Sequence, residues 1–492
     1  MLALHTVPGV LARRLAGLAL LVSLGACGPE ATPAPSDPAA AKLDSAMTAA
    51  LRALEIPGAA LTVVRDSVVT FRKAYGAADL ASGRSVTDST PFVIGSTSKP
   101  LTAMLVLRLV AAGRLALDTP IVRYVPDVRF ADPRASQITL RHLLTNRSGM
   151  VAGFSGPAFE RPYEQDSEAL DRLVREAATR PLLFAPGAGY TYSNRGWALA
   201  GYVAQRVEGV SVEELMDREV FGPLGMTGST LRFWERDLAQ GYHEGRTTRN
   251  LPGPASLTRR YGPAGMMAST NRDVGILLST LLRQGRTESG EPWLPAELVA
   301  EMFRPQAEAE SELGGPTRYG LGWEIDSTFG SLTIKKAGSV VTLVSFWVLL
   351  PEMRTGFGLL FNREDYRVVP LVANLVRVLG GGELQPFPET GPNPPFTAPT
   401  AAPIARPTVE AWTGRYDTRS GDLSIGWRGD TLVTRYEGMP AVLVPADDSS
   451  AILVDDVLTH AGRRLSFRPR RGVLTLWVDD DSVGVRVGPN RP

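Results

Sequence analysis

The chain has 492 residues, of which 44% are hydrophobic and 21% are charged, and its formal net charge is +1. This length suggests two or three domains, and the composition is that of a globular protein that buries a core. The balanced charge gives no support for a nucleic-acid-binding surface, and the single cysteine excludes internal disulfides, zinc fingers and CxxC redox chemistry.

The first predicted element is an export signal. Arg13 and Arg14 precede an apolar run that ends in Leu-Gly-Ala-Cys27. A positive segment, a short apolar segment and small residues are typical of a signal peptide, and the run is shorter than the roughly 20 residues of a spanning helix. The ending resembles the lipobox of bacterial lipoproteins, in which the cysteine is lipidated.

We therefore expect a lipoprotein signal over residues 1–27 and a tether rich in Pro and Ala over residues 28–41. Lipidation at Cys27 would anchor the chain to the bacterial envelope membrane, with the protein in the periplasm or on the extracytoplasmic face. The alternatives are a plain cleaved signal and an uncleaved anchor.

Strands are expected near both ends of the next 340 or so residues (42–382), with helices between them. A helix over 43–54 is followed by two strands joined at Asp66-Ser67, and a helix over Ser96–Ala112 comes next. Further helices are predicted at Ser167–Thr179, Gly196–Glu208, Ser211–Phe221 and Asn271–Gln284. Strands are predicted at Tyr319–Ile325, Ser331–Lys336, Val344–Leu350 and Gly356–Phe361, before a last helix over 366–379. This order predicts an α/β sandwich whose sheet is built from both ends of the domain.

A linker and a second domain are expected after this sandwich. Eight prolines lie between residues 386 and 407, a density that no packed element tolerates, so residues 383–407 are assigned to a linker. Short alternating segments separated by turn residues fill residues 408–492. They predict a small all-β, barrel-like domain.

The first candidate catalytic group is Ser96-Thr-Ser-Lys99 at the start of a predicted helix. Only five of the 52 basic residues are lysines, so a retained lysine calls for a chemical reason, because lysine can be deprotonated and arginine cannot. Residues three apart share a helix face, so Lys99 can reach the Ser96 hydroxyl as its proton acceptor or electrostatic partner. Taken alone, the pair is also explained by an N-capping serine beside a solvated lysine.

The second candidate group is Tyr192-Ser-Asn194, between a Pro-Gly loop and the helix from Gly196. In an extended segment, residues 192 and 194 point to the same side. A phenol with a pKa of about 10 is a poor base unless nearby cations lower that pKa. A loop tyrosine over the core, followed by a helix-capping Asn194, is the alternative.

The third candidate group is Lys336-Ala-Gly338-Ser339, expected at a strand end. The amine of Lys336 can hold a substrate carboxylate or act on a neighbouring ionisable group, and Gly338 allows the next N–H to approach a ligand closely. The neighbouring Lys335, on the other face, is expected to be an ordinary strand-ending lysine.

The order of the three groups along the chain, and the sequences that flank them, resemble those of the penicillin-recognising serine hydrolases. The most similar branch contains class C β-lactamases, D-alanyl-D-alanine carboxypeptidases, D-aminopeptidases and esterases. Four further segments resemble sequences of this family: Gly113-Arg-Leu-Ala-Leu-Asp-Thr-Pro, Ile138-Thr-Leu-Arg-His-Leu-Leu-Thr-Asn-Arg-Ser-Gly, Phe221-Gly-Pro-Leu-Gly-Met and Ala268-Ser-Thr-Asn-Arg-Asp. The tail, with Trp412-Thr-Gly-Arg-Tyr near its start, is similar to a lipocalin-like β domain that follows some members.

The resemblance implies a β-lactamase/transpeptidase-like fold and an acyl-enzyme on Ser96. It implies that Lys99 and Tyr192 share the general-base work and that Tyr192 hands a proton to the leaving group. Asn194 and Lys336 would orient the substrate. The backbone N–H groups of Ser96 and Ser339 would form the oxyanion hole, with Gly338 beside them. The implied partner is a small-molecule or peptide substrate, with no metal or cofactor.

Lys336 bears on the choice of substrate. Many esterase-like relatives carry histidine at this position, whereas members that bind a substrate carboxylate carry lysine. Lys336 therefore favours a peptide or a β-lactam-type ligand. Against this, the segment after Ser339 reads Val-Val-Thr-Leu and lacks the Pro-Gly-Phe run of those members, so the rim of the pocket is expected to differ.

Other readings have less support. A Ser-His-Asp hydrolase lacks its G-x-S-x-G motif, and His142 is expected to be a packed structural residue. His243-Glu244 lacks the second histidine of a zinc helix, and no Gly-Lys dipeptide is present for a P-loop. A non-catalytic penicillin-binding protein of the envelope, built on the same fold, is the alternative of a different class. Among enzymes, an esterase or peptidase is favoured over a β-lactamase.

Overall fold

The computed structural model describes residues 37–151, 164–242, 258–311, 315–340, 342–363, 368–387 and, with short gaps at its loops, 409–488. The expected signal, most of the tether and most of the Pro-rich linker lie outside these ranges. In the ranges themselves, every helix is too short or too polar to cross a membrane.

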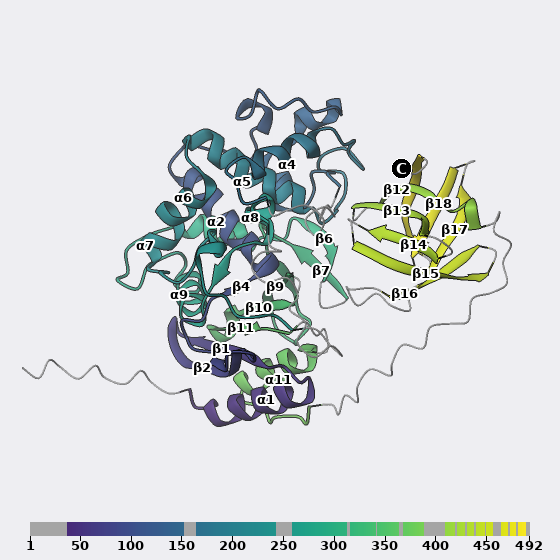
Figure 1. The fold of residues 1–492 in the computed structure, drawn as a ribbon. Helices are drawn as coiled ribbons and strands as arrows, with labels where there is room; N and C mark the ends of the chain where they lie inside the picture. The colour runs from purple at the N-terminus through teal and green to yellow at the C-terminus, as the bar shows by residue number, and fades with distance from the viewer. Residues whose placement is uncertain are drawn as a thin grey trace, which may run out of the picture. The chain divides into compact units, whose positions relative to one another are not determined.

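A nine-stranded antiparallel sheet forms the centre of the first domain, in the order β3-β2-β1-β11-β10-β9-β8-β7-β6 (Figure 1). The predicted sheet from both ends of the domain is confirmed, because the first strand pairs with the last, Ala59 opposite Phe361. The strands are β1 Gly58–Arg65, β2 Val68–Asp79, β3 Arg84–Ser85, β6 Ala307–Glu310, β7 Pro316–Tyr319, β8 Glu324–Asp326, β9 Thr333–Val340, β10 Leu343–Leu350 and β11 Thr355–Phe361. Every residue of β10 and β11 is buried, as expected for strands covered on both faces.

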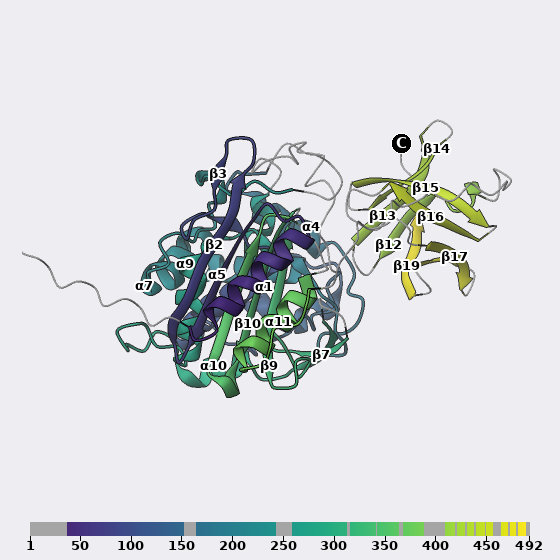
Figure 2. The same cartoon turned by 90° about the horizontal axis from the view of Figure 1, so that it is seen from below.

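Two helices cover one face of this sheet: α1 (Ala40–Ala53) and α11 (Val369–Leu379) lie across it in Figure 2. Leu43, Met47 and Ala50 recur at helical spacing in α1 and pack with Leu371 and Leu375 of α11 against the sheet. Truncating such a leucine typically costs about 2–5 kcal/mol, so this layer holds the two ends of the domain together.

The remaining helices cover the other face and form the larger core. They are α2 Ser98–Ala111, α3 Leu140–Leu144, α4 Ala169–Ala178, α5 Asn194–Glu208, α6 Val212–Met216, α7 Gly222–Leu224, α8 Gly262–Gly265, α9 Asn271–Leu282 and α10 Ala296–Met302. A two-stranded ladder of β4 (Phe92–Val93) and β5 (Ala268–Ser269) leads into α2.

Among the predicted elements that differ from the structure are one strand and two helices. The strand Tyr319–Ile325 is wrong, because β7 ends at Tyr319 and a tight turn containing Gly322, at φ +88°, precedes β8. The helix Ser211–Phe221 is divided, because a π-helical turn over Asp217–Phe221 follows α6. The helix placed at Ser96 begins two residues later, after a 3₁₀ turn over Gly95–Thr97.

The C-terminal residues form a closed eight-stranded barrel of β12–β19. Trp412 stacks on Phe467 at 4.7 Å between ring centroids, and the Tyr416 hydroxyl donates to the Trp412 carbonyl at 2.6 Å. The strands are β12 Gly414–Thr418, β13 Gly421–Arg428, β14 Thr431–Tyr436, β15 Met439–Asp447, β16 Ser450–Asp455, β17 Arg464–Arg470, β18 Val473–Val478 and β19 Asp481–Gly488. In the described residues of this domain, every strand pairs antiparallel with its neighbours, although Pro440 and Pro445 interrupt the alternating pattern within β15.

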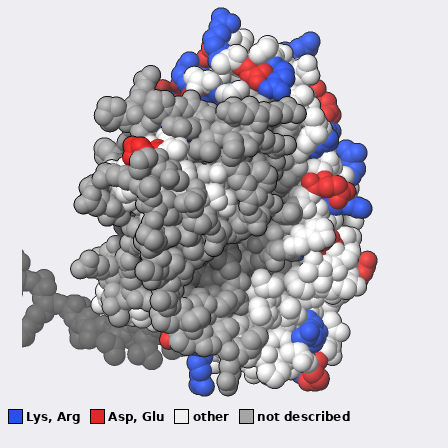
Figure 3. Space-filling view, turned by 90° about the vertical axis from the view of Figure 1, so that its right-hand side faces the viewer, with Lys and Arg blue, Asp and Glu red and all other residues white. Residues whose placement is uncertain are grey.

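The described surface carries both signs of charge. On the described part of the face in Figure 3, basic and acidic side chains are interspersed rather than gathered by sign. This agrees with the net charge of +1.

Candidate active site

Ser96 lies in the 3₁₀ turn between β4 and α2 and is partly exposed to solvent. The turn begins at Gly95, whose φ of +54° is unfavourable for residues with a side chain. A Cβ at position 95 would also lie 2.5 Å from the backbone nitrogen of Ser339. Gly95 therefore lets β9 approach the turn and leaves the Ser96 hydroxyl accessible.

Lys99 is fully buried, and its amine contacts three oxygens. Nζ lies 2.9 Å from Ser96 Oγ, 2.7 Å from Asn194 Oδ1 and 2.7 Å from the Ala264 carbonyl oxygen. The structure thus places Ser96 and Lys99, which are three residues apart, in contact, as the sequence predicts. It also shows a contact from α8, through the Ala264 carbonyl oxygen, that the sequence does not predict.

These contacts suit both protonation states of Lys99. An ammonium has three N–H donors, one for each oxygen. A neutral amine would keep two donors on the carbonyl oxygens of Asn194 and Ala264 and turn its lone pair toward the Ser96 hydroxyl. Because the hydroxyl can donate or accept, a proton can move from Ser96 Oγ to Lys99 Nζ without a change in the surrounding contacts.

Tyr192 lies between two lysines. Its ring centroid is 4.6 Å from Lys99 Nζ and 5.0 Å from Lys336 Nζ. Positive charges this close favour a phenolate over a neutral phenol. The three sequence groups, far apart in the chain, therefore converge on one ring.

Asn146 holds the segment that carries Tyr192. It is buried with a left-handed φ of +57°, a conformation that asparagine adopts more readily than most residues. Its carbonyl oxygen accepts from Thr191 N at 2.9 Å, and its side-chain oxygen accepts from Ser193 N at 3.2 Å and Trp197 Nε1 at 3.0 Å. Ser193 in turn caps α5 through Gly196 N, which places Asn194 in the first turn, facing Lys99.

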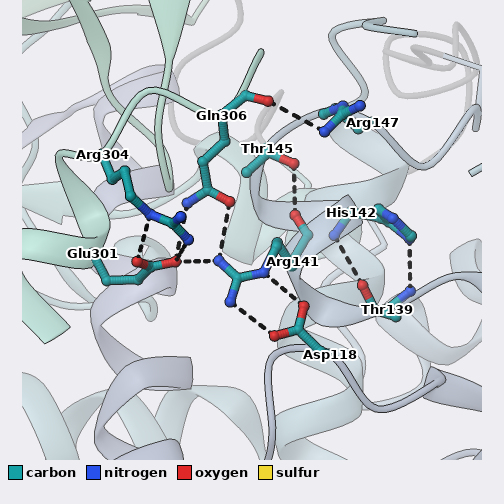
Figure 4. Close-up of polar contacts among 9 residues, drawn as sticks. All are labelled: Asp118, Thr139, Arg141, His142, Thr145, Arg147, Glu301, Arg304 and Gln306. Atoms are coloured by element: carbon teal, nitrogen blue, oxygen red, sulfur yellow. Dashed lines mark hydrogen bonds and ion pairs between the residues drawn. The ribbon is translucent and has the colours of Figure 1, made fainter. Parts of the chain in front are cut away.

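A polar network anchors α3, the helix that ends just before Asn146 (Figure 4). The Arg141 guanidinium donates to both oxygens of Asp118, at 2.6 and 2.8 Å, and to Gln306 Oε1 at 3.0 Å, and it also contacts Glu301. The Arg147 side chain donates to the Gln306 carbonyl at 3.2 Å. These contacts tie the segment before Asn146 to the residues that precede β6.

His142 belongs to the same region and closes the N-terminus of α3. Its backbone N–H donates to Thr139 Oγ1, and its Nδ1 accepts from the Thr139 N–H (Figure 4). Burial lowers the pKa of His142, and the charge of Arg147 acts in the same direction. A neutral imidazole that accepts at Nδ1 fits a structural role.

Lys336 lies within β9 rather than at its end, so the expectation of a strand-ending lysine is wrong. The strand continues to Val340 because Ser339 pairs with Val344 of β10. A Cβ at Gly338 would lie 2.7 Å from Ser96 N and 2.3 Å from the Ile94 carbonyl oxygen. Together with the close approach at Gly95, this places the backbone around Ser96 next to the backbone around Ser339.

Lys335 also differs from the expectation. It is 2% exposed, and its Nζ lies 2.8 Å from Asp326 Oδ2 in a buried ion pair. This partner has no signal in the sequence pattern, because the pair joins two neighbouring strands of the sheet.

A cavity of about 490 Å³ opens beside the cluster. Tyr190 lines it, and the Tyr190 ring contacts the Tyr319 ring, which lies 5.8 Å from Lys336 Nζ. Arg147, Arg318 and Glu308 add charge to its wall. Ser96 is not among the lining residues, so the cavity does not contain the candidate nucleophile, and Tyr190 is the lining residue that contacts a neighbour of Lys336.

The sequence predicted Ser96, Lys99, Tyr192, Asn194, Lys336, Gly338 and Ser339 for one site, and the structure brings them together. The prediction from sequence did not include Asn146, the Ala264 carbonyl or Glu324, the acidic neighbour of Lys336. Asn146 lies in one of the segments that resemble the family and could have been noticed there, whereas nothing in the sequence around Ala264 or Glu324 indicates a role in the site. Across the described ranges, no group of three His, Cys, Asp or Glu side chains could hold a metal ion. Cys27 lies outside those ranges.

Comparison with known proteins identifies similar chains. The family described as Beta-lactamase matches residues 43–379. Esterase EstB of Burkholderia gladioli is 36% identical over 218 residues, which cover 42% of this chain and 55% of that protein. A D-aminopeptidase of Brucella abortus is 28% identical over 294 residues, covering 58% of this chain and 52% of the relative. The chain therefore spans about half the length of these two curated relatives.

Solved structures support the fold. The octameric penicillin-binding protein homologue from Pyrococcus abyssi superposes with a TM-score of 0.61 at 22% identity, covering 91% of this chain and 99% of that one. The hydrolase EstCE1, described as having promiscuous acyltransferase activity, gives a TM-score of 0.56 at 22% identity, covering 65% of this chain and 93% of its own. At this identity the likeness shows a shared fold.

Proposed function

The chain belongs to the β-lactamase family, and from this premise we propose that it is a serine hydrolase that cleaves ester or amide bonds through an acyl-enzyme on Ser96. One observation carries the proposal: the Lys99 amine lies 2.9 Å from Ser96 Oγ, and its two other contacts are carbonyl oxygens that can only accept. This arrangement leaves the serine hydroxyl as the one neighbour of those three that can give a proton to the amine.

In the proposed acylation, Ser96 Oγ attacks the substrate carbonyl carbon as its proton passes to Lys99 Nζ. The negative charge that develops on the carbonyl oxygen is stabilised by the N–H groups of Ser96 and Ser339. When the bond to the leaving group breaks, the proton on Lys99 Nζ passes through the Tyr192 hydroxyl to the leaving alkoxide or amine, which leaves Lys99 neutral. Lys99 then takes a proton from the water that attacks the acyl carbon, and this proton returns to Ser96 Oγ as the acyl bond breaks.

The relatives suggest the substrate class. They are named as an esterase and a D-aminopeptidase, and a further relative in Escherichia coli is named as a β-lactamase, 28% identical over 274 residues. We propose carboxylic esters and D-amino-acid peptides as the first candidates, with β-lactams as the second. A shared fold does not decide among these, since one constellation serves all three.

Labelling and turnover test this proposal. The chain from residue 28 onward is treated with a fluorophosphonate, and its peptides are analysed by mass spectrometry. We expect one adduct, on the peptide that contains Ser96. The unlabelled protein is also assayed with p-nitrophenyl acetate, a D-alanyl peptide and nitrocefin, and turnover of the ester or the peptide should exceed that of nitrocefin. A folded protein that is not labelled at Ser96 would contradict the mechanism.

A non-catalytic envelope penicillin-binding protein is the competing function. It would form an adduct with a fluorescent penicillin but would turn over none of the three substrates. The partly exposed Ser96 and the buried, contact-rich Lys99 favour the enzyme, because a proton acceptor beside the nucleophile also serves the deacylation that a binder lacks.

We further propose that the mature protein is held on the envelope membrane by lipid on Cys27. The support is the sequence alone: a short apolar run that ends in Leu-Gly-Ala-Cys. Expressed with its signal in a bacterium, the protein should be found in the membrane fraction and incorporate labelled palmitate. The Cys27→Ser variant should lose the label. Equal labelling of both proteins would rule out this anchor.

A further inference from the structure

Lys336 is buried on the catalytic side of the sheet. Its residue exposure is 1%, and its amine faces the rings of Tyr192 and Tyr319 at 5.0 and 5.8 Å. Ile334 and Val340, on the same side of β9 by alternation, belong to the core beneath the helices of the catalytic side. The charge of Lys336 therefore acts on the site and is little screened by water.

A carboxylate lies beside this amine. Glu324 on the adjacent strand β8 places Oε1 3.7 Å from Lys336 Nζ, and the two side chains are 3% and 0% exposed. The other oxygen, Oε2, accepts a hydrogen bond of 2.5 Å from Ser311 Oγ. The carboxylate is thus fixed from two sides and has the opposite charge to Lys336.

This pairing changes what Lys336 can do for a substrate. An unpaired buried ammonium would attract a substrate carboxylate strongly, because no water competes for it. A buried ammonium that already faces a fixed carboxylate has its charge balanced. An incoming carboxylate would share the amine with Glu324 and would be repelled by it.

We propose that Glu324 is a specificity-determining residue that balances the charge of Lys336 and so directs the site toward esters whose acyl group is uncharged. The inference rests on the proposed serine hydrolase function and narrows its substrate class. Glu324 acts through Lys336, so it is a positioning residue rather than a catalytic one. This differs from the expectation from sequence, in which Lys336 favours a substrate that carries a carboxylate.

The chain supplies a matched control pair. Lys335 and Asp326 lie on the same two strands, with side chains that are 2% and 8% exposed, and are joined at 2.8 Å. Lys335 faces the opposite side, since its amine lies over Phe329, which packs with the core under α1 and α11. Glu324→Gln and Asp326→Asn therefore remove the same charge from the same short strand, next to Lys336 in the first variant and next to Lys335 in the second.

The test compares two substrates with one leaving group: p-nitrophenyl butyrate, which is neutral, and the mono-p-nitrophenyl ester of succinic acid, whose acyl group ends in a carboxylate. The wild type should prefer the butyrate in kcat/KM. Glu324→Gln should shift the ratio of kcat/KM toward the succinate ester by about 10-fold or more, chiefly through a lower KM for that ester. Asp326→Asn should leave the ratio within about 2-fold of wild type, because the charge that it removes is paired with Lys335 and not with Lys336.

Three results would overturn the inference: a wild type that prefers the succinate ester, an unchanged ratio in Glu324→Gln, or an equal shift in Asp326→Asn. Fluorophosphonate labelling of Ser96 in each variant reports whether the site is assembled. No ester turnover and no label in the wild type would instead contradict the proposed function, which separates the two failures.

A measurement on the wild type alone covers the case in which Glu324→Gln does not fold. Phenylboronic acid and carboxyphenylboronic acid, which bind serine nucleophiles reversibly, are compared as inhibitors of butyrate hydrolysis. Equal or weaker inhibition by the carboxylated compound supports a balanced Lys336. Stronger inhibition by that compound would overturn it.

Discussion

The Ser96→Ala variant is expected to lose at least about 1,000-fold in kcat/KM for p-nitrophenyl acetate and to take up no fluorophosphonate. The reason is that the alanine has no oxygen to form the acyl bond, and Lys99 and Tyr192 have no hydroxyl to act on. Steady-state kinetics and intact-protein mass spectrometry measure the two effects. Circular dichroism should show an unchanged fold, because Ser96 is partly exposed and lies in a turn.

Ser98→Ala is the matched control for this prediction. Ser98 lies two residues further on, is fully buried, and accepts a hydrogen bond from Met267 N at 3.2 Å rather than one from Lys99. Its loss should reduce stability by about 1–3 kcal/mol through the unpaired N–H, while kcat/KM stays within about 3-fold of wild type. If Ser96→Ala retained the activity of Ser98→Ala, the acyl-enzyme on Ser96 would be wrong.

The catalytic cluster was largely predictable because each group carries a local signal. Ser96 and Lys99 are three residues apart at a helix start, and Tyr192 and Asn194 flank the serine that caps the next helix. Such spacings fix side-chain direction within one turn or one extended segment. Spacing along the chain does not give the distance between the three groups in space. The expectation that they lie together came from the resemblance to the family.

The parts that were missed depend on contacts between different elements of the fold. Glu324 meets Lys336, and Asp326 meets Lys335, only because β8 and β9 pair antiparallel with their register set by the whole sheet. The contact from Ala264 uses a backbone carbonyl, which no residue type reveals. The misplaced strand over 319–325 has a similar cause: its apolar residues continue through a turn that Gly320 and Gly322 make possible.

The role of Lys99 gives the last prediction, since two variants separate its charge from its proton transfer. Lys99→Met removes both and should lower kcat/KM by about 1,000-fold or more. Lys99→Arg keeps a positive charge beside Ser96, but a guanidinium cannot lose its proton in a protein. If the Ser96 proton passes to Nζ, the arginine variant should be nearly as inactive as the methionine variant.

The opposite result would reassign the base. Should Lys99→Arg keep more than about a tenth of the wild-type kcat/KM, charge alone would suffice and the proton would have to pass to another group, for which Tyr192 is the candidate. Stopped-flow release of p-nitrophenol resolves acylation from deacylation, and thermal unfolding checks that the larger side chain is accommodated. The contacts at 2.7 Å to Asn194 and Ala264 favour the first outcome, because they hold a neutral amine with its lone pair toward the hydroxyl as well as they hold an ammonium.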